Sequence, residues 1–318
     1  MSDDDAEVPA SKARARAMFA LKLAIAGLAL AWTLTRAPLA ALLDSARRMS
    51  AFALLAGLAL SALNLVFAAA RSRVVLAAYG APAPPRLSTL VRLQWVGVFY
   101  NTVLPGNVGG DVVRAHAMRD AFAGGPNAYV VVLLERVFGL AGLLTLSASI
   151  LAVHPVAGVT GLSRLAVLGV VAALLAATAP LVARRLGRHV PGKLGALLLR
   201  LPEAGRPGFL VLAFALSITT QALVAGTGLL LVHAVAPGVA AAGVLALVPV
   251  AQVATYFPAT IAGLGVREAA FVVLLSHAGV PKADATVASL SMLALQLTVA
   301  LIGGLLHVAT PTRAATGV

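Results

Sequence analysis

The sequence has 318 residues, of which 60% are hydrophobic and 11% are charged, and this excludes an ordinary soluble domain, in which about a quarter of residues are charged. The net charge of +13 comes largely from short segments between long apolar runs, which favours contact with a membrane surface and excludes nucleic acid as the expected partner. The chain has no cysteine, so neither disulfides nor thiolate metal ligands are expected.

Six long apolar runs predict membrane-spanning helices. A helix that crosses the hydrocarbon core needs about 20 apolar residues, because the core is about 30 Å thick and each residue rises about 1.5 Å. Basic residues precede the first run, but it has no small-x-small cleavage site in a polar flank, so we interpret it as a retained span and not as a signal peptide. We therefore predict an all-α polytopic membrane protein with six full spans, at 19–35, 51–70, 127–153, 165–183, 208–235 and 284–309.

Two further apolar segments, 90–119 and 243–276, are interrupted by proline and glycine. The first contains LPGNVGGDVVR at 104–114, and the second contains FPATIAGLGVR at 257–267. Proline ends a helix and glycine permits a reversal of the chain, so we predict two re-entrant hairpins, each of which enters and leaves the membrane on one side. Non-helical backbone at membrane depth persists only beside protein or a water-filled cavity, which indicates a functional site. The predicted hairpin breaks are Pro105, Gly106, Gly109, Gly110, Pro258, Gly263 and Gly265.

The two interrupted stretches align with each other without gaps. At an offset of 153 residues, five of the thirteen positions from 102 to 114 are identical, and the same offset carries 127–153 onto 280–306, close to the last predicted span. Each half then holds an odd number of full spans, so the second half is expected to be inverted relative to the first. Transporters with this architecture place the substrate site at their broken helices. The predicted half-repeats are about 19–153 and 165–309.

The distribution of basic residues predicts the orientation of the chain. With the N-terminus in the cytoplasm, fourteen Lys and Arg residues fall in the cytoplasmic segments and five on the opposite side, in agreement with the positive-inside rule. We therefore expect a multi-pass protein of the cell (inner) membrane, with cytoplasmic tails at 1–18 and 310–318 around a membrane domain at 19–309. The other segments expected in the cytoplasm are 71–92 and 184–207.

Ionisable residues near the first break are candidates for substrate binding. Asp111 and Arg114 lie at the start of the returning half-helix, where free N–H groups favour an anion and the guanidinium fork suits phosphate. Glu135 and Arg136 lie about two turns inside the next apolar run, at a depth where ionisable groups are costly and usually functional. We expect Glu135 to pair with Arg114, and Arg136 to face headgroups or Asp111. The alternative is that Arg114 and Glu135 form a structural pair that only fixes the hairpin in the bundle.

The second break carries a related but unequal set of residues. Arg267 matches Arg114, whereas Leu264 stands in the place of Asp111 and Glu268 follows the arginine. We predict that Arg267 and Glu268 also line the substrate path; alternatively, they lie at the membrane interface with the arginine extended toward water. Four glycines are expected only to let helices pack closely, namely Gly139, Gly142, Gly226 and Gly228.

No motif indicates catalysis, a metal or a cofactor. The patterns HExxH, GxxxxGK[ST] and GxSxG do not occur, and the six histidines are scattered singly along the chain. We therefore expect no enzyme activity, no metal site and no cofactor.

Three stretches in this order resemble one known family. They are FYNTVLPGNVGGDVVRAHAMR at 99–119, LLERVFGLAGL at 133–143 and TYFPATIAGLGVREAAFVVLL at 255–275. They resemble the flippase-like membrane family that includes the membrane domain of lysylphosphatidylglycerol synthases, and the resemblance covers nearly the whole chain. It implies a domain that binds polar lipids and, in the synthases, moves an aminoacylated phospholipid between leaflets. The chain ends at Val318 without the soluble synthase domain, so we expect a stand-alone form that cannot itself make lysylphosphatidylglycerol.

These observations together predict a lipid flippase or transporter that moves a polar or anionic lipid between leaflets. The expected partners are membrane lipids, whether phospholipid, hopanoid or polyprenyl-linked, and we expect Arg114 and Arg267 to hold the lipid phosphate in turn while the two halves rock. One alternative is a membrane glycosyltransferase or other lipid-modifying enzyme. The longest loop, 184–207, counts against it, because Glu203 is the loop's single acidic residue. Another alternative is a non-transporting partner of lipid-synthesis enzymes.

Overall fold

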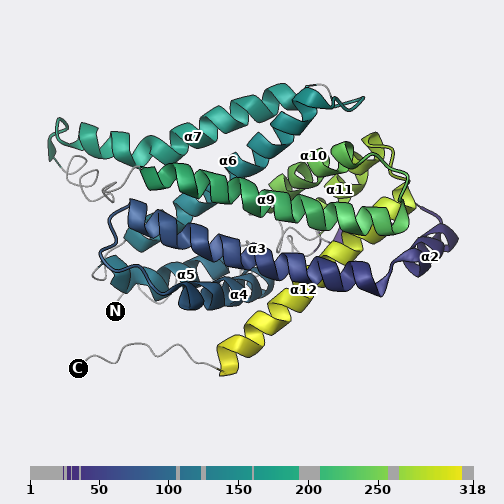
Figure 1. The fold of residues 1–318 in the computed structure, drawn as a ribbon, viewed down its shortest axis with the longest axis horizontal. Coiled ribbons are helices and arrows are strands. Elements are labelled where there is room, and N and C mark those ends of the chain that lie inside the picture. The colour runs from purple at the N-terminus through teal and green to yellow at the C-terminus, as the bar shows by residue number, and fades with distance from the viewer. Residues whose placement is uncertain are drawn as a thin grey trace, which may run out of the picture.

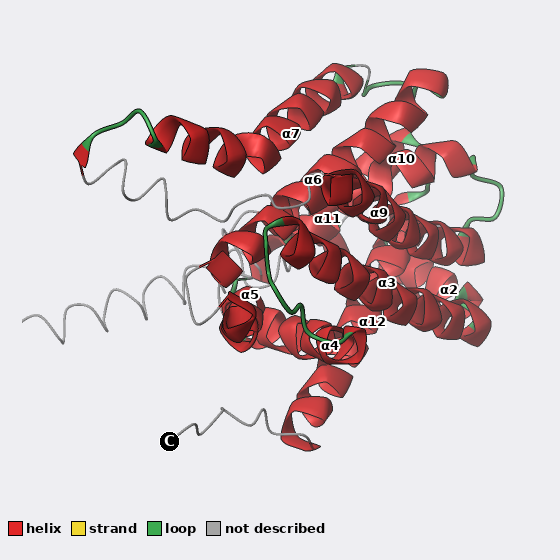
Figure 2. Cartoon of the chain, turned by 60° about the vertical axis from the view of Figure 1, so that its left-hand side comes forward, coloured by secondary structure: helices red, strands yellow, loops and turns green. Residues whose placement is uncertain are grey.

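The computed structural model describes residues 24, 27–29, 31–35, 37–104, 108–122, 127–159, 161–192, 208–256 and 265–309. The regular elements in these ranges are all helices, which confirms the predicted all-α class (Figure 2). The predicted tails lie outside the described residues, as do Pro105, Gly106, Pro258 and Gly263, and the predicted first span is described only in part. The helices are α2 (Leu39–Arg48), α3 (Ala51–Ala78), α4 (Leu87–Val103), α5 (Gly109–Met118), α6 (Asn127–Val153), α7 (Leu162–Gly187), α9 (Gly208–Val235), α10 (Ala241–Gln252), α11 (Val266–His277) and α12 (Lys282–Ala309), with short 3-10 turns η2 (Arg119–Phe122) and η3 (Val253–Tyr256).

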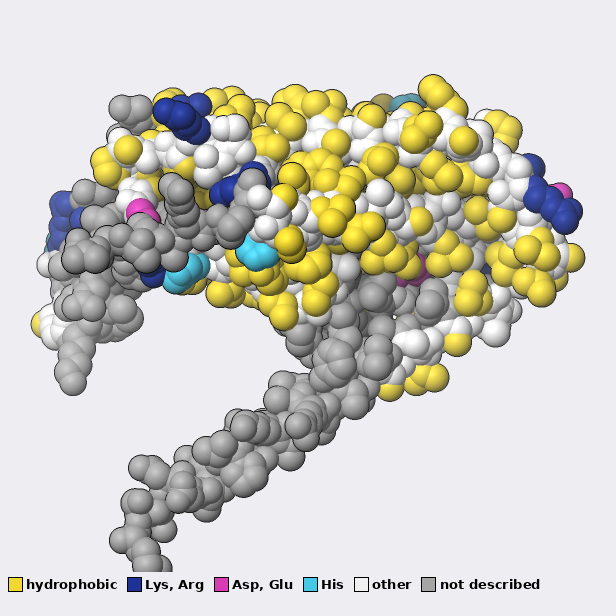
Figure 3. All heavy atoms as spheres, turned by 90° about the horizontal axis from the view of Figure 1, so that it is seen from below, with side chains coloured by type: hydrophobic (Ala, Val, Ile, Leu, Met, Phe, Trp, Pro, Cys, Tyr) yellow, Lys and Arg dark blue, Asp and Glu magenta, His cyan; other side chains and the backbone are white. Residues whose placement is uncertain are grey.

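Four helices, α3, α6, α9 and α12, are long and apolar enough to cross a membrane. Each has 27 or 28 residues and is therefore about 40 Å long, more than the hydrocarbon core requires. On the face shown in Figure 3, hydrophobic side chains cover the middle of the molecule, and Lys and Arg side chains lie toward its left part and its right end. The chain is thus a multi-pass membrane protein. Helix α7 contains the predicted span 165–183 and packs against α6.

Helices α3 and α9 lie side by side along the centre of the bundle and run in opposite directions (Figure 1). Around them α4 packs against α12, and α10 packs against α6. Glycine permits two of the closest approaches. A Cβ on Gly142 of α6 would lie 2.7 Å from the Ser217 carbonyl carbon of α9, and a Cβ on Gly303 of α12 would lie 2.1 Å from the Trp95 carbonyl oxygen of α4.

Both interrupted segments form pairs of short helices. Helix α4 ends at Val103 and α5 begins at Gly109, and the two helices pack against each other. Their contact is tight at Gly110, because a Cβ there would lie 1.9 Å from the Gly97 carbonyl oxygen. The Gly110 N–H donates to Asn101 Oδ1 at 2.8 Å, so a side chain of α4 satisfies one free N–H group at the start of α5.

The second pair is α10, continued by η3, and α11. Helix α10 packs against α11, and Gly265, with φ of 80°, precedes the first residue of α11. This left-handed conformation favours glycine, which explains why the sequence has one there. The order of α3, α4, α5 and α6 therefore recurs in α9, α10, α11 and α12.

Helix α3 differs from the sequence prediction at its C-terminal end. The prediction ended the span at residue 70 and placed Arg71 in a cytoplasmic loop, but the helix continues to Ala78. Apolar residues follow the two arginines and extend the buried face, since Val75, Leu76 and Ala78 are fully buried. Arg71 thus lies within the helix and not in a loop.

Candidate functional site

Helix α5 brings Arg114 against α6 in a buried ion pair. Arg114 Nη2 donates to Glu135 Oε2 at 2.5 Å and to Ser72 Oγ at 2.9 Å, and Nη1 donates to Asp111 Oδ1 at 3.4 Å. Arg114 is 7% exposed and Glu135 is 1% exposed. The Arg114 side chain passes directly over Gly97, where a Cβ would lie 2.7 Å from Arg114 Cδ. The pairing expected from the sequence is therefore present.

The carboxylate of Asp111 joins the second arginine of α6 to this pair. Arg136 Nε donates to Asp111 Oδ2, so Arg136 takes the second of its two expected orientations. Asp111 is in the first turn of α5, and the residue at the N-cap position of this helix is Val108, whose side chain makes no capping hydrogen bond. The two carboxylate oxygens of Asp111 accept from Arg114 and Arg136. Asp111, Arg114, Glu135 and Arg136 thus form a connected group with no net charge.

This group lines a cavity of about 180 Å³ that we call the charged chamber. Three arginines and two carboxylates border it, so one positive charge remains after pairing. That charge belongs to Arg71 of α3, whose Nη1 donates weakly to Ser217 Oγ at 3.4 Å. Among the described residues, no carboxylate oxygen lies within 4.0 Å of the Arg71 nitrogens, and its buried Nε has no hydrogen-bond partner. The chamber is lined by Arg71, Asp111, Arg114, Val132, Glu135, Arg136, Thr255 and Tyr256.

A second, mostly apolar cavity of about 320 Å³ adjoins the charged chamber, and we call it the apolar groove. The two cavities share Asp111, Val132, Arg136 and Tyr256 as lining residues. The outer part of the groove is exposed, because Leu133 is 62% exposed and other apolar side chains of α5 and α6 there are also exposed. The groove is lined by Val108, Asp111, Val112, Ala115, Tyr129, Val132, Leu133, Arg136 and Tyr256. A charged interior thus opens beside an apolar surface.

The residues of the second break form a separate ion pair. Arg267 Nε and Nη2 donate to Glu268 Oε1 at 2.9 and 2.5 Å, and Arg267 Nη1 donates to Gln296 Oε1. The Gly265 N–H donates to Glu268 Oε2 at 2.6 Å, so the same carboxylate closes the N-terminus of α11. Arg267 is 5% exposed and Glu268 is fully buried. The interfacial alternative requires Arg267 to extend toward water, but both side chains are buried.

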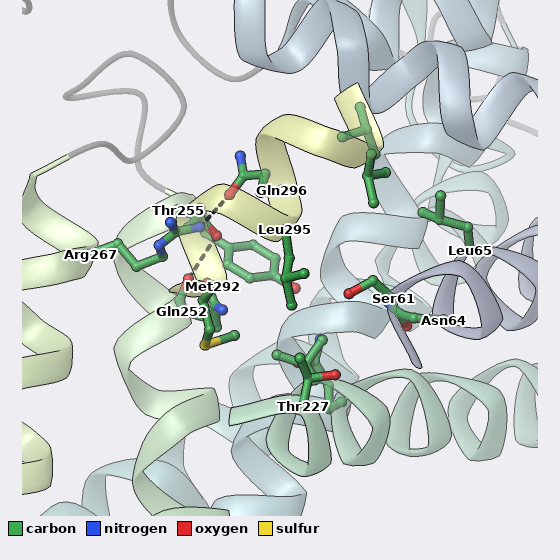
Figure 4. Close-up of a pocket in the computed structure, with 15 residues that line it drawn as sticks. Ser61, Asn64, Leu65, Thr227, Gln252, Thr255, Arg267, Met292, Leu295 and Gln296 are labelled. Atoms are coloured by element: carbon green, nitrogen blue, oxygen red, sulfur yellow. Dashed lines mark hydrogen bonds between the residues drawn. The ribbon is translucent and has the colours of Figure 1, made fainter. Parts of the chain in front are cut away.

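Arg267 lines a third cavity, of about 290 Å³, which we call the central cavity (Figure 4). In the figure, Ser61 and Asn64 of α3 lie on one side and Arg267 and Gln296 on the other. The wall contains four amides and three aliphatic hydroxyls, and its residues are Ser61, Asn64, Leu65, Val98, Gln221, Val224, Thr227, Gln252, Thr255, Tyr256, Arg267, Met292, Leu295, Gln296 and Val299. Thr255 and Tyr256 also line the charged chamber, so the two spaces are adjacent at η3.

The candidate residues therefore fall into two groups. Asp111, Arg114, Glu135 and Arg136 come together at the charged chamber, whereas Arg267 lies at the central cavity with Glu268 behind it. Sequence reasoning missed Arg71 and Tyr256. The signal for Arg71 was the apolar sequence VVLAA at 74–78, which allows the helix to continue past the arginine.

Glycines of α6 and α9 differ in what they contact. A Cβ on Gly139 would lie 2.8 Å from Tyr256 Oη and 3.4 Å from Arg71 Nη1, so Gly139 leaves room for chamber residues. Gly142 and Gly228 meet neighbouring helices closely, as expected, whereas Gly226 has open space around its Cα.

A model of the family described as lysylphosphatidylglycerol synthase TM region matches residues 19–304. The chain belongs to this family. The matched range contains every residue of the charged chamber, the apolar groove and the central cavity. Membership of the lysylphosphatidylglycerol synthase TM region family indicates a membrane protein related to lipid modification or transport. None of the curated proteins compared with the chain matches it.

Proposed function

We propose that this protein moves a polar or anionic lipid between the two leaflets of a membrane. The observation that carries the proposal is the charged chamber beside the apolar groove, in a bundle whose four longest spans are strongly apolar. A lipid has the same two-part chemistry, because its headgroup needs polar partners and its acyl chains need apolar surface. Ionisable residues inside a membrane are costly and are usually retained for transport paths.

Arg71 is the residue that gives the chamber affinity for an anion. The other two arginines are held by Asp111 and Glu135, whereas no carboxylate oxygen among the described residues lies within 4.0 Å of the Arg71 guanidinium. A lipid phosphate would supply that partner, and the guanidinium fork binds phosphate oxygens in a bidentate manner. Asp111, Arg114, Glu135 and Arg136 then hold the chamber in shape around the phosphate. The acyl chains would lie along the apolar groove between α5 and α6.

The order of the helices supports an inverted repeat for this function. Helices α3 to α6 recur as α9 to α12, the central helices α3 and α9 are antiparallel, and the contact of α4 with α12 has its counterpart in α10 with α6. We propose that the α4–α5 and α10–α11 pairs are re-entrant hairpins and that the two halves rock about η3. Alternating access of this kind exposes one site to each leaflet in turn.

Vesicle transport tests the proposal. The purified protein is placed in vesicles that carry a fluorescent phosphatidylglycerol, and an impermeant quencher reports how fast label from the inner leaflet reaches the outer leaflet. We expect the protein to accelerate exchange and Arg71→Gln to slow it roughly tenfold or more, because a hydrogen bond to a charged group contributes about 1.5–3 kcal/mol and 1.4 kcal/mol is tenfold. Arg73→Gln is the matched control, since Arg73 is exposed on the same helix.

Each outcome of this assay has a definite meaning. Exchange no faster than in empty vesicles would overturn lipid translocation. Equal rates for Arg71→Gln and Arg73→Gln would overturn the role of Arg71. Mass spectrometry of the recovered lipid separates transport from the enzyme alternative, because transport leaves the mass of the lipid unchanged.

A further inference from the structure

The central cavity differs in chemistry from the charged chamber. It has a single ionised side chain in its wall, Arg267, whose three nitrogens donate to Glu268 and Gln296. Among the described residues no carboxylate lines the cavity. The nearby Glu268 carboxylate accepts hydrogen bonds from Arg267 and from the Gly265 N–H. The wall is therefore polar but has no uncompensated charge.

We infer that the central cavity binds the uncharged, hydroxyl-rich headgroup of the transported lipid, such as a glycerol, inositol or sugar unit, and excludes headgroups that carry an amine. This inference rests on the proposed lipid transport, and it names the class of lipid. The argument has three parts: the hydrogen-bonding groups of the wall, its charge and its position.

The hydroxyl groups of the wall are arranged to accept hydrogen bonds. Ser61 Oγ donates to the Gly57 carbonyl at 2.8 Å, and Thr227 Oγ1 donates to the Leu223 carbonyl at 2.9 Å. Each oxygen keeps lone pairs for a ligand. The buried Oδ1 of Asn64 has no hydrogen-bond partner and is a further acceptor.

The amides of the wall supply the donors. Gln296 accepts from Arg267 through Oε1, so its NH₂ group remains to donate to a ligand. Gln252 also contributes an amide to the wall. A hydroxyl both donates and accepts, so a polyol or sugar matches such a mixed set of groups. The volume of about 290 Å³ is at the small end of ligand pockets, which suits one headgroup unit.

The charge of the wall disfavours an ammonium group. A buried ammonium needs an anionic partner, and the one ionised wall residue is itself positive. The second half also lacks the charges of the first. Counted from the first residue of each helix, the positions in α9 and α12 that correspond to Arg71, Glu135 and Arg136 are Gly228, Leu290 and Ser291, which are all uncharged.

The position of the cavity suits the headgroup of a lipid whose phosphate is in the charged chamber. Thr255 and Tyr256 of η3 line both spaces, so they are adjacent. A phosphate near Arg71 and a neutral headgroup beyond η3 would thus each meet matching chemistry.

The test compares lipids of equal net charge and equal acyl chains. Phosphatidylglycerol, phosphatidylinositol and phosphatidylserine each carry one net negative charge, but only the serine headgroup is itself ionised, with an ammonium and a carboxylate beside the phosphate. We measure thermal stabilisation of the full-length protein in detergent by each lipid, and transport of each in vesicles. We expect the glycerol and inositol lipids to bind and move roughly tenfold better than the serine lipid. This factor is the effect of one missing hydrogen bond to a charged group, which is about 1.5 kcal/mol.

Charge variants make the inference specific to this cavity. Asn64→Asp and Gln252→Glu supply the missing anion and should shift the preference toward the serine lipid, whereas Ser88→Asp, at an exposed position, should leave it unchanged. Equal binding of all three lipids, or a preference that neither cavity variant alters, overturns the inference even if transport occurs. Selective binding without any transport supports the inference and overturns the proposed transport instead.

Discussion

The buried pair of Arg114 and Glu135 makes an unequal double-mutant prediction. We expect Arg114→Gln to destabilise the protein more than Glu135→Gln, and the double variant to lose less than the sum of the two. The reason is that the two partners have different second contacts. Arg114 also contacts Asp111 and Ser72, whereas Glu135 Oε1 is buried without a hydrogen-bond partner.

The magnitudes follow from these contacts. Glu135 is 1% exposed, and in the Arg114 variant it has lost its ion-pair partner. The free energy of unfolding should then fall by nearly as much as when one partner of a buried ion pair is removed, which is about 3–5 kcal/mol. Without Glu135, Arg114 keeps Asp111 at 3.4 Å and Ser72 at 2.9 Å. The loss should then be closer to one charge-assisted hydrogen bond, about 1.5–3 kcal/mol. The non-additivity expected for residues in contact is about 0.5–3 kcal/mol.

The assay is the apparent melting temperature of the four proteins in one detergent, together with vesicle transport. Arg119→Gln is the control, because the Arg119–Asp120 pair is exposed and contributes at most about 1 kcal/mol. Additive losses would refute the contact, and a larger loss for Glu135→Gln would refute the reasoning about second contacts. If the double variant regains both stability and transport, the pair is structural and the alternative stated from the sequence is correct.

Two further predictions concern the hairpin and the orientation. Gly110→Ala should lower the melting temperature markedly, because the new Cβ would lie 1.9 Å from the Gly97 carbonyl oxygen. Gly226→Ala is the control and should be tolerated, because its Cβ would meet nothing within 4 Å. Equal effects of the two variants would contradict the close contact of α4 with α5. The orientation is tested with single cysteines in this cysteine-free chain and a reagent that does not cross the membrane. Cysteines at two exposed positions should react only from the cytoplasm, and cysteines at two others only from outside. A reaction from the opposite side at any of them would contradict the six-span inverted topology. The cytoplasmic positions are Ser88 and His189, and the outside positions are Ala157 and Lys282.

The sequence predicted helix interruptions well, because proline and glycine act on the backbone locally. Both interrupted segments are pairs of short helices, and glycine stands where the structure needs it, at the Gly97 contact of Gly110 and at the left-handed Gly265. The Arg114–Glu135 pair was also predictable, since an ionised group deep in an apolar run needs a partner nearby. The ends of spans were less predictable. Arg71 looked like the end of a span, but packing of the residues after it extends α3.

The division of the site into three cavities could not be predicted from the sequence. From the repeat we expected Arg114 and Arg267 to hold the lipid phosphate in turn, but the partners of each arginine depend on tertiary contacts. Arg114 pairs with a different helix, whereas Arg267 pairs with the next residue, Glu268. The position of Tyr256, on three cavity walls at once, depends on how η3 fits between the halves of the chain.

The balance of charges in the chamber bears on how a transporter releases its lipid. Three free arginines would hold a phosphate strongly, and a tightly bound lipid would leave slowly. Asp111 and Glu135 remove two of these arginines from competition, so a single unpaired cation, Arg71, remains among the described residues. A substrate path needs binding that is strong enough for entry and weak enough for exit. Under the proposed transport, the two buried carboxylates would therefore act on the function as well as on the fold, because they would limit the affinity of the chamber for a phosphate to what one guanidinium group provides.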